Sequence, residues 1–207
     1  MQERAQNAAR LCGLLAVGTF AASFLTFASL TPDFDWLNDY ISMLGARGAP
    51  YATAWNISGF VIPGLLLAIF GATLGLSLKD RISGACLVVA GLGFAVAAAP
   101  TDPMDANATL SKAHFASICI SLAGWCGTLA RVSSMDRIDV RIRYWTSRAS
   151  LLVFLPVMLV AAELVSPPLA HRLILLIIFG WISAVALLQS DKALTESTVP
   201  RQHSVDQ

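Results

Sequence analysis

The sequence predicts an all-α, polytopic membrane helix bundle with six transmembrane helices, both termini inside and a short interfacial helix in the first outer loop. Three observations lead to this fold class. Of the 207 residues, 56% are hydrophobic and only 13% are charged, whereas a soluble domain carries about 25% charged residues. Six apolar runs are long enough to cross the hydrocarbon core of a bilayer as helices. The basic residues are divided very unequally between the two sides of the membrane.

The apolar runs place the spans at about residues 11–30, 54–78, 82–99, 110–129, 149–166 and 169–188. Unbroken apolar runs predict helices, because the strands of a membrane barrel would alternate. The first run follows a basic start and has no A-x-A-like cleavage site after it, which favours a retained span over a removed signal peptide. We expect one transmembrane domain over residues 1–190 and a disordered cytoplasmic tail over 191–207, since that stretch is polar.

The distribution of Lys and Arg predicts the orientation. With the N-terminus on side one, eleven of the fourteen basic residues fall on that side, and three fall on the other: Arg47, Lys112 and Arg172. Basic residues concentrate in cytoplasmic loops. We therefore expect a multi-pass protein of the plasma membrane with both termini cytoplasmic and three outward-facing connections.

The first outer connection, DFDWLNDYISMLGARGAP at residues 33–50, is unusually acidic and aromatic for a connector. Thr31, Pro32 and Asp33 have the pattern of a helix start. If this segment is a helix, one face is polar and the opposite face is apolar. The polar face consists of Asp35, Asn38, Asp39 and Ser42. The apolar face consists of Trp36, Leu37, Tyr40, Ile41 and Leu44. Such a pattern predicts a short helix at the membrane boundary, ended by Gly45 and Gly48.

Charge, cysteines and glycines limit the classes of partner that we expect. A net charge of +1 gives no reason to expect nucleic acid. The four cysteines lie in or beside apolar runs without C-x-x-C spacing, so we expect free thiols. Glycines recur at small-xxx-small spacing, as in Gly71 and Gly75, which indicates close helix packing. The expected partners are the lipid bilayer and a hydrophobic small molecule, with a homodimer as an open possibility.

Polar and ionisable residues collect at the predicted outer ends of the spans, where such residues are costly and usually functional. His114, Ser117 and Ser121 share one face of the fourth span, which should point into the bundle. Glu163 could either join a site or form an ion pair with Arg172. The candidate catalytic residues are Asp102, Asp105, His114, Asp39 and Glu163. The candidate substrate-binding residues are Trp36, Tyr40, Ser42, Asn56, Phe115, His171 and Arg172.

Three segments also resemble a known family. YISMLGARGAPYATAWNISGFVIPGLLLAIFG, AVAAAPTDP and KAHFAS are similar to segments of the bacterial membrane-protein family called domain of unknown function 998. The matching residues are Ser42, Leu44, Gly45, Pro100, Asp102 and His114, and more loosely Arg172 and Trp181. Met43 stands where an acidic residue is common in the family. The resemblance implies a six-helix protein over about residues 11–190 and an outer-face constellation shared with relatives, but no activity.

The outer residues favour an enzyme whose substrate enters from the outer leaflet. Carboxylates and imidazoles in a desolvated setting suit acid–base chemistry. The first expectation is a membrane-bound terpene cyclase without a cofactor, in which Asp102 or Asp105 protonates an isoprenoid and aromatic rings shield a carbocation. The second is a lipid hydrolase with zinc held by His114, His171 and Asp102; a haem between the two histidines is a weaker alternative. A non-catalytic lipid-binding or transport protein and an accessory subunit remain open.

Overall fold

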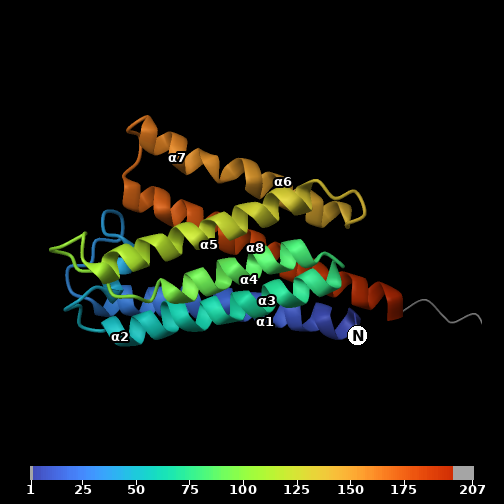
Figure 1. Cartoon of the computed structure of the whole chain (residues 1–207), viewed down its shortest axis with the longest axis horizontal. Helices are drawn as coiled ribbons and strands as arrows, with labels where there is room; N and C mark the ends of the chain where they lie inside the picture. The colour runs from blue at the N-terminus through green and yellow to red at the C-terminus, as the bar shows by residue number, and fades with distance from the viewer. Residues whose placement is uncertain (1, 198–207) are drawn as a thin grey trace, which may run out of the picture.

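The structure, a computed structural model, describes the backbone of residues 2–197 and the side chains of residues 2–189. Every regular element in this range is a helix, and none of these residues forms a strand (Figure 1). In chain order the elements are α1 (Gln2–Leu30), η1 (Ile41–Gly45), α2 (Ala52–Trp55), η2 (Asn56–Val61), α3 (Ile62–Ser77), α4 (Arg81–Val96), α5 (Thr109–Ser133), α6 (Val140–Leu152), α7 (Phe154–Ala161) and α8 (Pro167–Ser197). The four cysteines are free, as predicted.

Five helical segments are long and apolar enough to cross a membrane: Gln2–Leu30, Ala52–Ser77, Thr109–Ser133, Val140–Ala161 and Pro167–Gln189. The second of them joins α2, η2 and α3, and the fourth joins α6 and α7. Helix α4 is a sixth apolar helix of 16 residues, about 24 Å at 1.5 Å per residue. It is therefore somewhat shorter than the roughly 30 Å of a hydrocarbon core.

Several predicted boundaries differ from the structure; α1, for example, begins at Gln2 and not at residue 11. The fifth span begins at Val140, well before the predicted residue 149, because Asp139 caps α6 by accepting a hydrogen bond from the Arg141 amide at 2.8 Å. The basic stretch that follows is therefore helical and not a loop. At the other end, α8 continues to Ser197, so residues 191–197 of the predicted disordered tail are helical. The rest of that tail, 198–207, lies outside the described residues.

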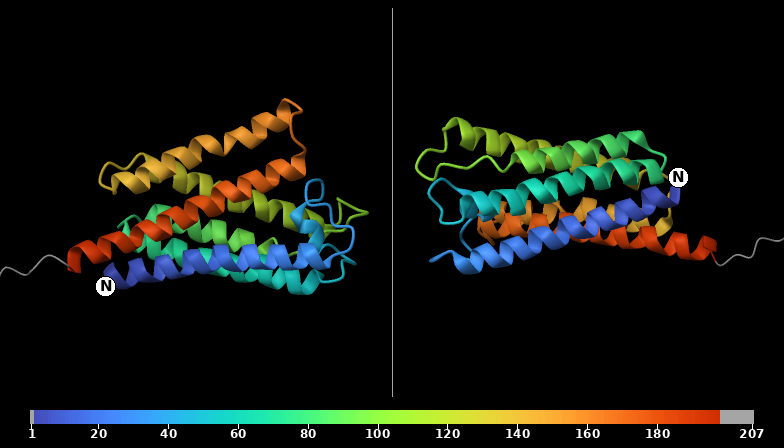
Figure 2. Two further views of the ribbon diagram at one scale, coloured as in Figure 1. Left: turned by 180° about the vertical axis from the view of Figure 1, so that it is seen from behind. Right: turned by 90° about the horizontal axis from the view of Figure 1, so that it is seen from below.

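The helices form a closed ring. Neighbours run α1, α3, α4, α5, α6 and α8, and α8 then packs on α1. The start of α1 and the end of α8 lie at the same end of the bundle, which we call the termini end (Figures 1 and 2). The turn 78–80 and the loop 134–139 join their helices there. The opposite end, the loop end, holds the connections 31–51, 97–108 and 162–166.

Small residues allow α3 and α4 to approach closely, as the glycine spacing predicted. A Cβ atom added to Gly75 would lie 2.6 Å from the Cα atom of Gly84, well inside van der Waals contact. The polar face of α5 points into the bundle, also as predicted: Ser117 is buried, and the α5 backbone at Ser117 and Ser121 lies against Gly93 of α4.

The predicted interfacial helix is wrong over residues 33–40. This segment forms turns, and only the short 3-10 helix η1 follows it. The carboxylate of Asp35 accepts hydrogen bonds from the Leu37 and Asn38 amides at 2.8 and 3.0 Å. Such side-chain bonds offer the backbone an alternative to a helix. Asp33 adopts a φ of 59°, which a right-handed helix does not allow. Hydrogen bonds from the Asn38 side chain and from these amides lower the pKa of Asp35.

Candidate active site at the loop end

A cleft of about 480 Å³ opens at the loop end. It lies between Tyr40 and the η1 segment, the 97–108 connection, the first turns of α5 and the start of α8. Its lining consists of Tyr40, Ser42, Met43, Thr101, Asp102, Pro103, Ala106, Ser111, His114, Phe115, Ile118 and His171. Hydroxyls, two imidazoles and a carboxylate therefore share one cleft with apolar side chains.

The cleft contains half of the predicted site residues. Six of the twelve line it: Tyr40, Ser42, Asp102, His114, Phe115 and His171. The other six lie outside its lining: Trp36, Asp39, Asn56, Asp105, Glu163 and Arg172. The sequence correctly placed both groups at the same end of the bundle, but only the first group lines the cleft.

His114 is oriented by the backbone of the preceding connection. Its Nδ1 atom lies 2.6 Å from the carbonyl oxygen of Ala97. Because a carbonyl only accepts, Nδ1 carries the proton, and Nε2 is the nitrogen left to accept one. The ring of Phe60 stands edge to face against the imidazole at 5.8 Å between centroids. These two contacts fix the tautomer and the plane of a possible general base.

His171 lies opposite, at the start of α8. Its Nδ1 atom is buried and has no hydrogen-bond partner among the described residues. The ring of Tyr40 lies 6.1 Å away between centroids, tilted by 56°. Buried polar atoms are normally paired, so an unpartnered imidazole nitrogen at a cleft is a position where a ligand or water can bind.

Asp102 is held firmly at the rim of the cleft. Its Oδ2 accepts from Arg47 Nη1 at 3.3 Å, and its Oδ1 accepts from the Met104 amide at 3.0 Å. Its own amide donates to Ser111 Oγ at 2.9 Å, and that hydroxyl donates to the Asp105 carbonyl at 3.2 Å. Both carboxylate oxygens therefore accept hydrogen bonds within the protein.

Two bonds from distant helices hold the η1 segment over the cleft. Arg172 Nη2 donates to the Asp39 carbonyl at 2.6 Å, and Asn56 Nδ2 donates to the Gly45 carbonyl at 2.9 Å. Only glycine fits at position 45, because a Cβ there would overlap with the Asn56 carboxamide. Asn56 and Arg172 therefore position Tyr40 and Ser42 and do not line the cleft themselves.

Of the two alternatives for Glu163, the ion pair with Arg172 does not form in the structure. Arg172 Nη1 donates to the Pro168 carbonyl at 3.1 Å, and its guanidinium lies over the Phe34 ring at 5.9 Å. Glu163 is exposed in the turn between α7 and α8, with a φ of 58°. Glu163 is not among the residues that line the cleft.

The remaining predicted residues have local structural contacts. Asp105 accepts a hydrogen bond from the Asn107 amide at 2.8 Å, which closes a turn. The Asp39 carboxylate accepts one from the Asp35 amide at 2.9 Å. Trp36 packs edge to face on Phe24 at 5.4 Å.

The geometry does not bring together a metal-ligand set. Among the described residues, no three His, Cys, Asp or Glu side chains are grouped closely enough to hold a metal ion. His114, His171 and Asp102 share the cleft as separate groups, and Asp102 and His114 Nδ1 already have protein partners. We therefore assign no metal site to these residues.

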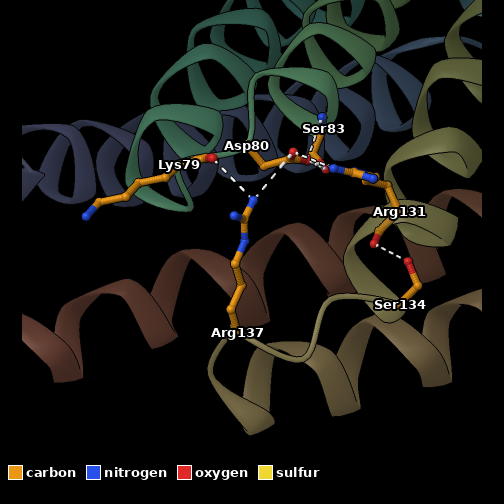
Figure 3. Close-up of polar contacts among 6 residues, drawn as sticks. All are labelled: Lys79, Asp80, Ser83, Arg131, Ser134 and Arg137. Atoms are coloured by element: carbon orange, nitrogen blue, oxygen red, sulfur yellow. Dashed lines mark hydrogen bonds and ion pairs between the residues drawn. The ribbon is translucent and has the colours of Figure 1, made fainter.

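The termini end contains a polar cluster of residues that are not among the predicted site residues. Figure 3 shows the buried carboxylate of Asp80 between α3 and α4, with Arg131 reaching it from α5. Arg131 Nη2 and Nε lie 3.1 and 3.3 Å from its two oxygens, and the Ser83 amide donates to it at 3.1 Å. Arg137 approaches the same carboxylate at 3.9 Å and donates to the Lys79 carbonyl at 3.4 Å.

The guanidinium of Arg131 holds the pKa of Asp80 down at about 2, against the effect of burial, which raises it. The carboxylate also caps α4 through Ser83. Each of these contacts joins parts of the protein to one another. The Asp80 cluster is therefore part of the scaffold.

Sequence signals for the missed residues existed. Ser111 precedes His114 by three positions and so continues its helical face. Asp80 and Ser83 at the start of an apolar run have the spacing of a helix cap. No local signal pairs Arg47 with Asp102, because 55 positions separate them.

The helices and their apolar surfaces define an all-helical, multi-pass membrane protein with a polar cleft at one end. The family model described as protein of unknown function (DUF998) matches residues 14–188. The chain belongs to this family, as the resemblance of its motifs indicated. A search of the curated proteins and a search of the solved structures found no match.

Proposed function

We propose that the chain is an integral membrane enzyme that acts on a hydrophobic isoprenoid or lipid substrate by acid–base chemistry in the cleft at the loop end. One observation carries this proposal: two imidazoles, a carboxylate and a phenol from four separate parts of the chain line one cleft beside apolar side chains. Polar groups held in a membrane protein at this cost are usually functional.

His114 is the group best suited to move a proton. Its Nδ1–H is bound to the Ala97 carbonyl, so Nε2 can accept a proton from a substrate or, once protonated, return it. In a cyclisation, the imidazolium form of His114 donates its Nε2 proton to the epoxide oxygen and the C–O bond breaks. An alkene then attacks the resulting carbon, and the neutral Nε2 takes the proton that leaves the final carbocation. Asp102 is ion-paired and serves better to stabilise developing positive charge than to donate the first proton.

The cleft suits a substrate that arrives from the bilayer. Phe115 is 69% exposed on α5 and lines the cleft, and Ile118 lies one turn further into the membrane on the same helix. An apolar chain can follow this face, while its polar or reactive end reaches His114 and His171. The rings of Tyr40 and Phe115 can shield a cationic intermediate.

The proposed setting is the plasma membrane with both termini cytoplasmic. The termini end carries most of the Lys and Arg residues, which is the pattern of a cytoplasmic face. The cleft then opens to the outer leaflet.

The test is turnover by the full-length protein in lipid nanodiscs supplied with epoxidised isoprenoids or with phospholipids, followed by mass spectrometry. We expect conversion of the isoprenoid, with His114→Ala and Asp102→Asn each lowering kcat at least about 100-fold. Lys112→Gln and Asp33→Asn, which alter exposed groups at the same end, should retain wild-type turnover.

The possible results separate the alternatives. Hydrolysed phospholipid in place of a cyclised product would favour the lipid hydrolase. Tight binding of the isoprenoid without turnover would favour a non-catalytic lipid-binding protein. Full activity in both His114→Ala and Asp102→Asn would show that the cleft is not the active site.

A further inference from the structure

A second cleft lies at the termini end, far from the proposed active site. It has a volume of about 510 Å³ and lies between the end of α5 and one face of α6. The lining residues are Ser133, Asp136, Val140, Arg143, Tyr144, Ser147, Arg148 and Leu151. Guanidinium and hydroxyl groups, the usual ligands of phosphate, thus line a cleft that also has apolar walls.

Helix α6 presents an unusual stripe on its outer surface. The face that packs on the bundle is buried at Ile142, Thr146 and Ala149, and Thr146 Oγ1 accepts a hydrogen bond from Trp181 Nε1 at 3.0 Å. Exposed residues follow one another at three and four positions on the outer surface: Arg141, Tyr144, Trp145 and Arg148. A helix face that met only lipid tails would be apolar. Arg, Tyr and Trp together are typical of the headgroup layer.

The cationic charge in this cleft is only partly neutralised. Arg143 Nη1 lies 2.7 Å from Asp136, whose side chain is fully exposed, and such exposed pairs are weak. The guanidinium of Arg148 lies over the Tyr144 ring at 5.0 Å. Among the described residues, no carboxylate lies within 4.0 Å of Arg148.

The apolar part of the cleft is continuous with the membrane-facing surface. Leu151 lines the cleft and is 70% exposed, and on the same span Phe154 and Met158 are 65% and 68% exposed. A molecule with its anionic group between Arg143 and Arg148 would therefore have its chains along the lipid-facing side of α6 and α7. Figures 1 and 2 show that these two helices lie at the edge of the bundle.

We propose that this cleft binds an anionic phospholipid of the adjoining leaflet. Arg148 and Arg143 contact its phosphate, the hydroxyl of Ser147 donates a further hydrogen bond to it, and its acyl chains lie along Leu151. This site is independent of the proposed enzymatic activity. The proposal also does not depend on which side of the membrane the termini end faces, because the lipid comes from the leaflet on that side.

The test is native mass spectrometry of the full-length protein in detergent, with phosphatidylglycerol and phosphatidylcholine offered at equal concentration. We expect at least ten-fold more retained phosphatidylglycerol, and a fall to the phosphatidylcholine level in the double variant Arg143→Gln/Arg148→Gln. The matched control Arg4→Gln/Arg81→Gln removes the same charge from exposed positions at the same end and should retain the preference.

Two further measurements, a cleft-filling variant and a competition experiment, test the proposal independently. Ser147→Phe fills the cleft without changing charge and should give the same loss, so the proposal does not depend on a double variant that fails to purify. Glycerol phosphate at the same concentration should not displace the lipid, because it has no chains. Equal loss in the matched control, equal retention of both lipids, or displacement by glycerol phosphate would overturn the proposal.

Discussion

The two ends of the bundle each hold a carboxylate paired with an arginine, and the pairs differ in almost every other respect. Asp80 at the termini end has a side chain only 5% exposed and two close contacts from Arg131. Asp102 at the loop end is 22% exposed and meets a 73% exposed Arg47 at a single 3.3 Å contact. The first pair joins helices. The second lies at the rim of a cleft.

The difference extends to the surrounding polar groups. At the termini end, the Asp80 carboxylate accepts from Arg131 and Ser83 and leaves little capacity for a ligand. At the loop end, His171 Nδ1 is buried without a partner among the described residues, and His114 Nε2 is free of the bond that holds Nδ1. The two ends therefore differ in how much hydrogen-bonding capacity their polar side chains leave unused.

The largest expected effect is on stability at the termini end. Asp80→Asn removes the buried charge that accepts hydrogen bonds from Arg131 and Ser83, and a hydrogen bond to a charged group contributes about 1.5–3 kcal/mol. Thermal unfolding of the purified protein should show a clearly lower Tm, while turnover per folded molecule stays unchanged. The dependence of Tm on pH provides a second test of the role of Asp80.

The pKa of Asp80 in the folded protein is about 2, below the value of about 3.9 in an unfolded chain. Its contribution to stability is therefore complete above about pH 4 and is lost as the pH falls through about 2. The wild type should lose Tm in this window, and Asp80→Asn should lack that component. Equal acid sensitivity in both proteins would argue against the Asp80 cluster as a scaffold.

An intermediate effect on stability is expected at Gly45, where the η1 segment packs closely on Asn56. Gly45→Ala places a methyl group against the Asn56 carboxamide, and such overpacking costs about 1–3 kcal/mol. Because the displaced segment supplies Tyr40 and Ser42 to the cleft, turnover should fall together with Tm. The double variant Gly45→Ala/Asn56→Ala should recover part of the Tm loss. A Gly45→Ala protein with wild-type Tm and turnover would show that this contact does not position the cleft.

The smallest effect is expected for the exposed pair. Arg47→Gln leaves the backbone bond from the Arg47 amide to the Thr101 carbonyl, 2.8 Å long, in place. It removes only an exposed ion pair, worth about 0–1 kcal/mol. Tm should change little, as measured beside Asp80→Asn in the same detergent. A loss as large as that of Asp80→Asn would remove the distinction between the two ends.

Particular elements show how far the sequence could be interpreted. The apolar runs predicted the helices because hydrophobic length is a local property, and α1, α5 and α8 were recognised with shifted boundaries. The interfacial helix failed because Asp35 and Asp39 bond the local backbone in turns. The spacing of polar and apolar residues does not show whether such side-chain bonds will replace a helix. Half of the predicted site residues line the cleft, because several helices end close together at the loop end. Asn56 and Arg172 instead hold the η1 segment in place.

The sequence by itself determined that the chain is helical and apolar enough to cross a membrane several times, and which residues lie near each end. Both follow from composition and from the order of polar and apolar residues along the chain. Only the tertiary structure decided which carboxylate is saturated and which faces a cleft, because those contacts join residues such as Asp80 and Arg131, 51 positions apart. The hydrogen bonds that distinguish a scaffold from a site form between helices, and no local pattern in the chain records them.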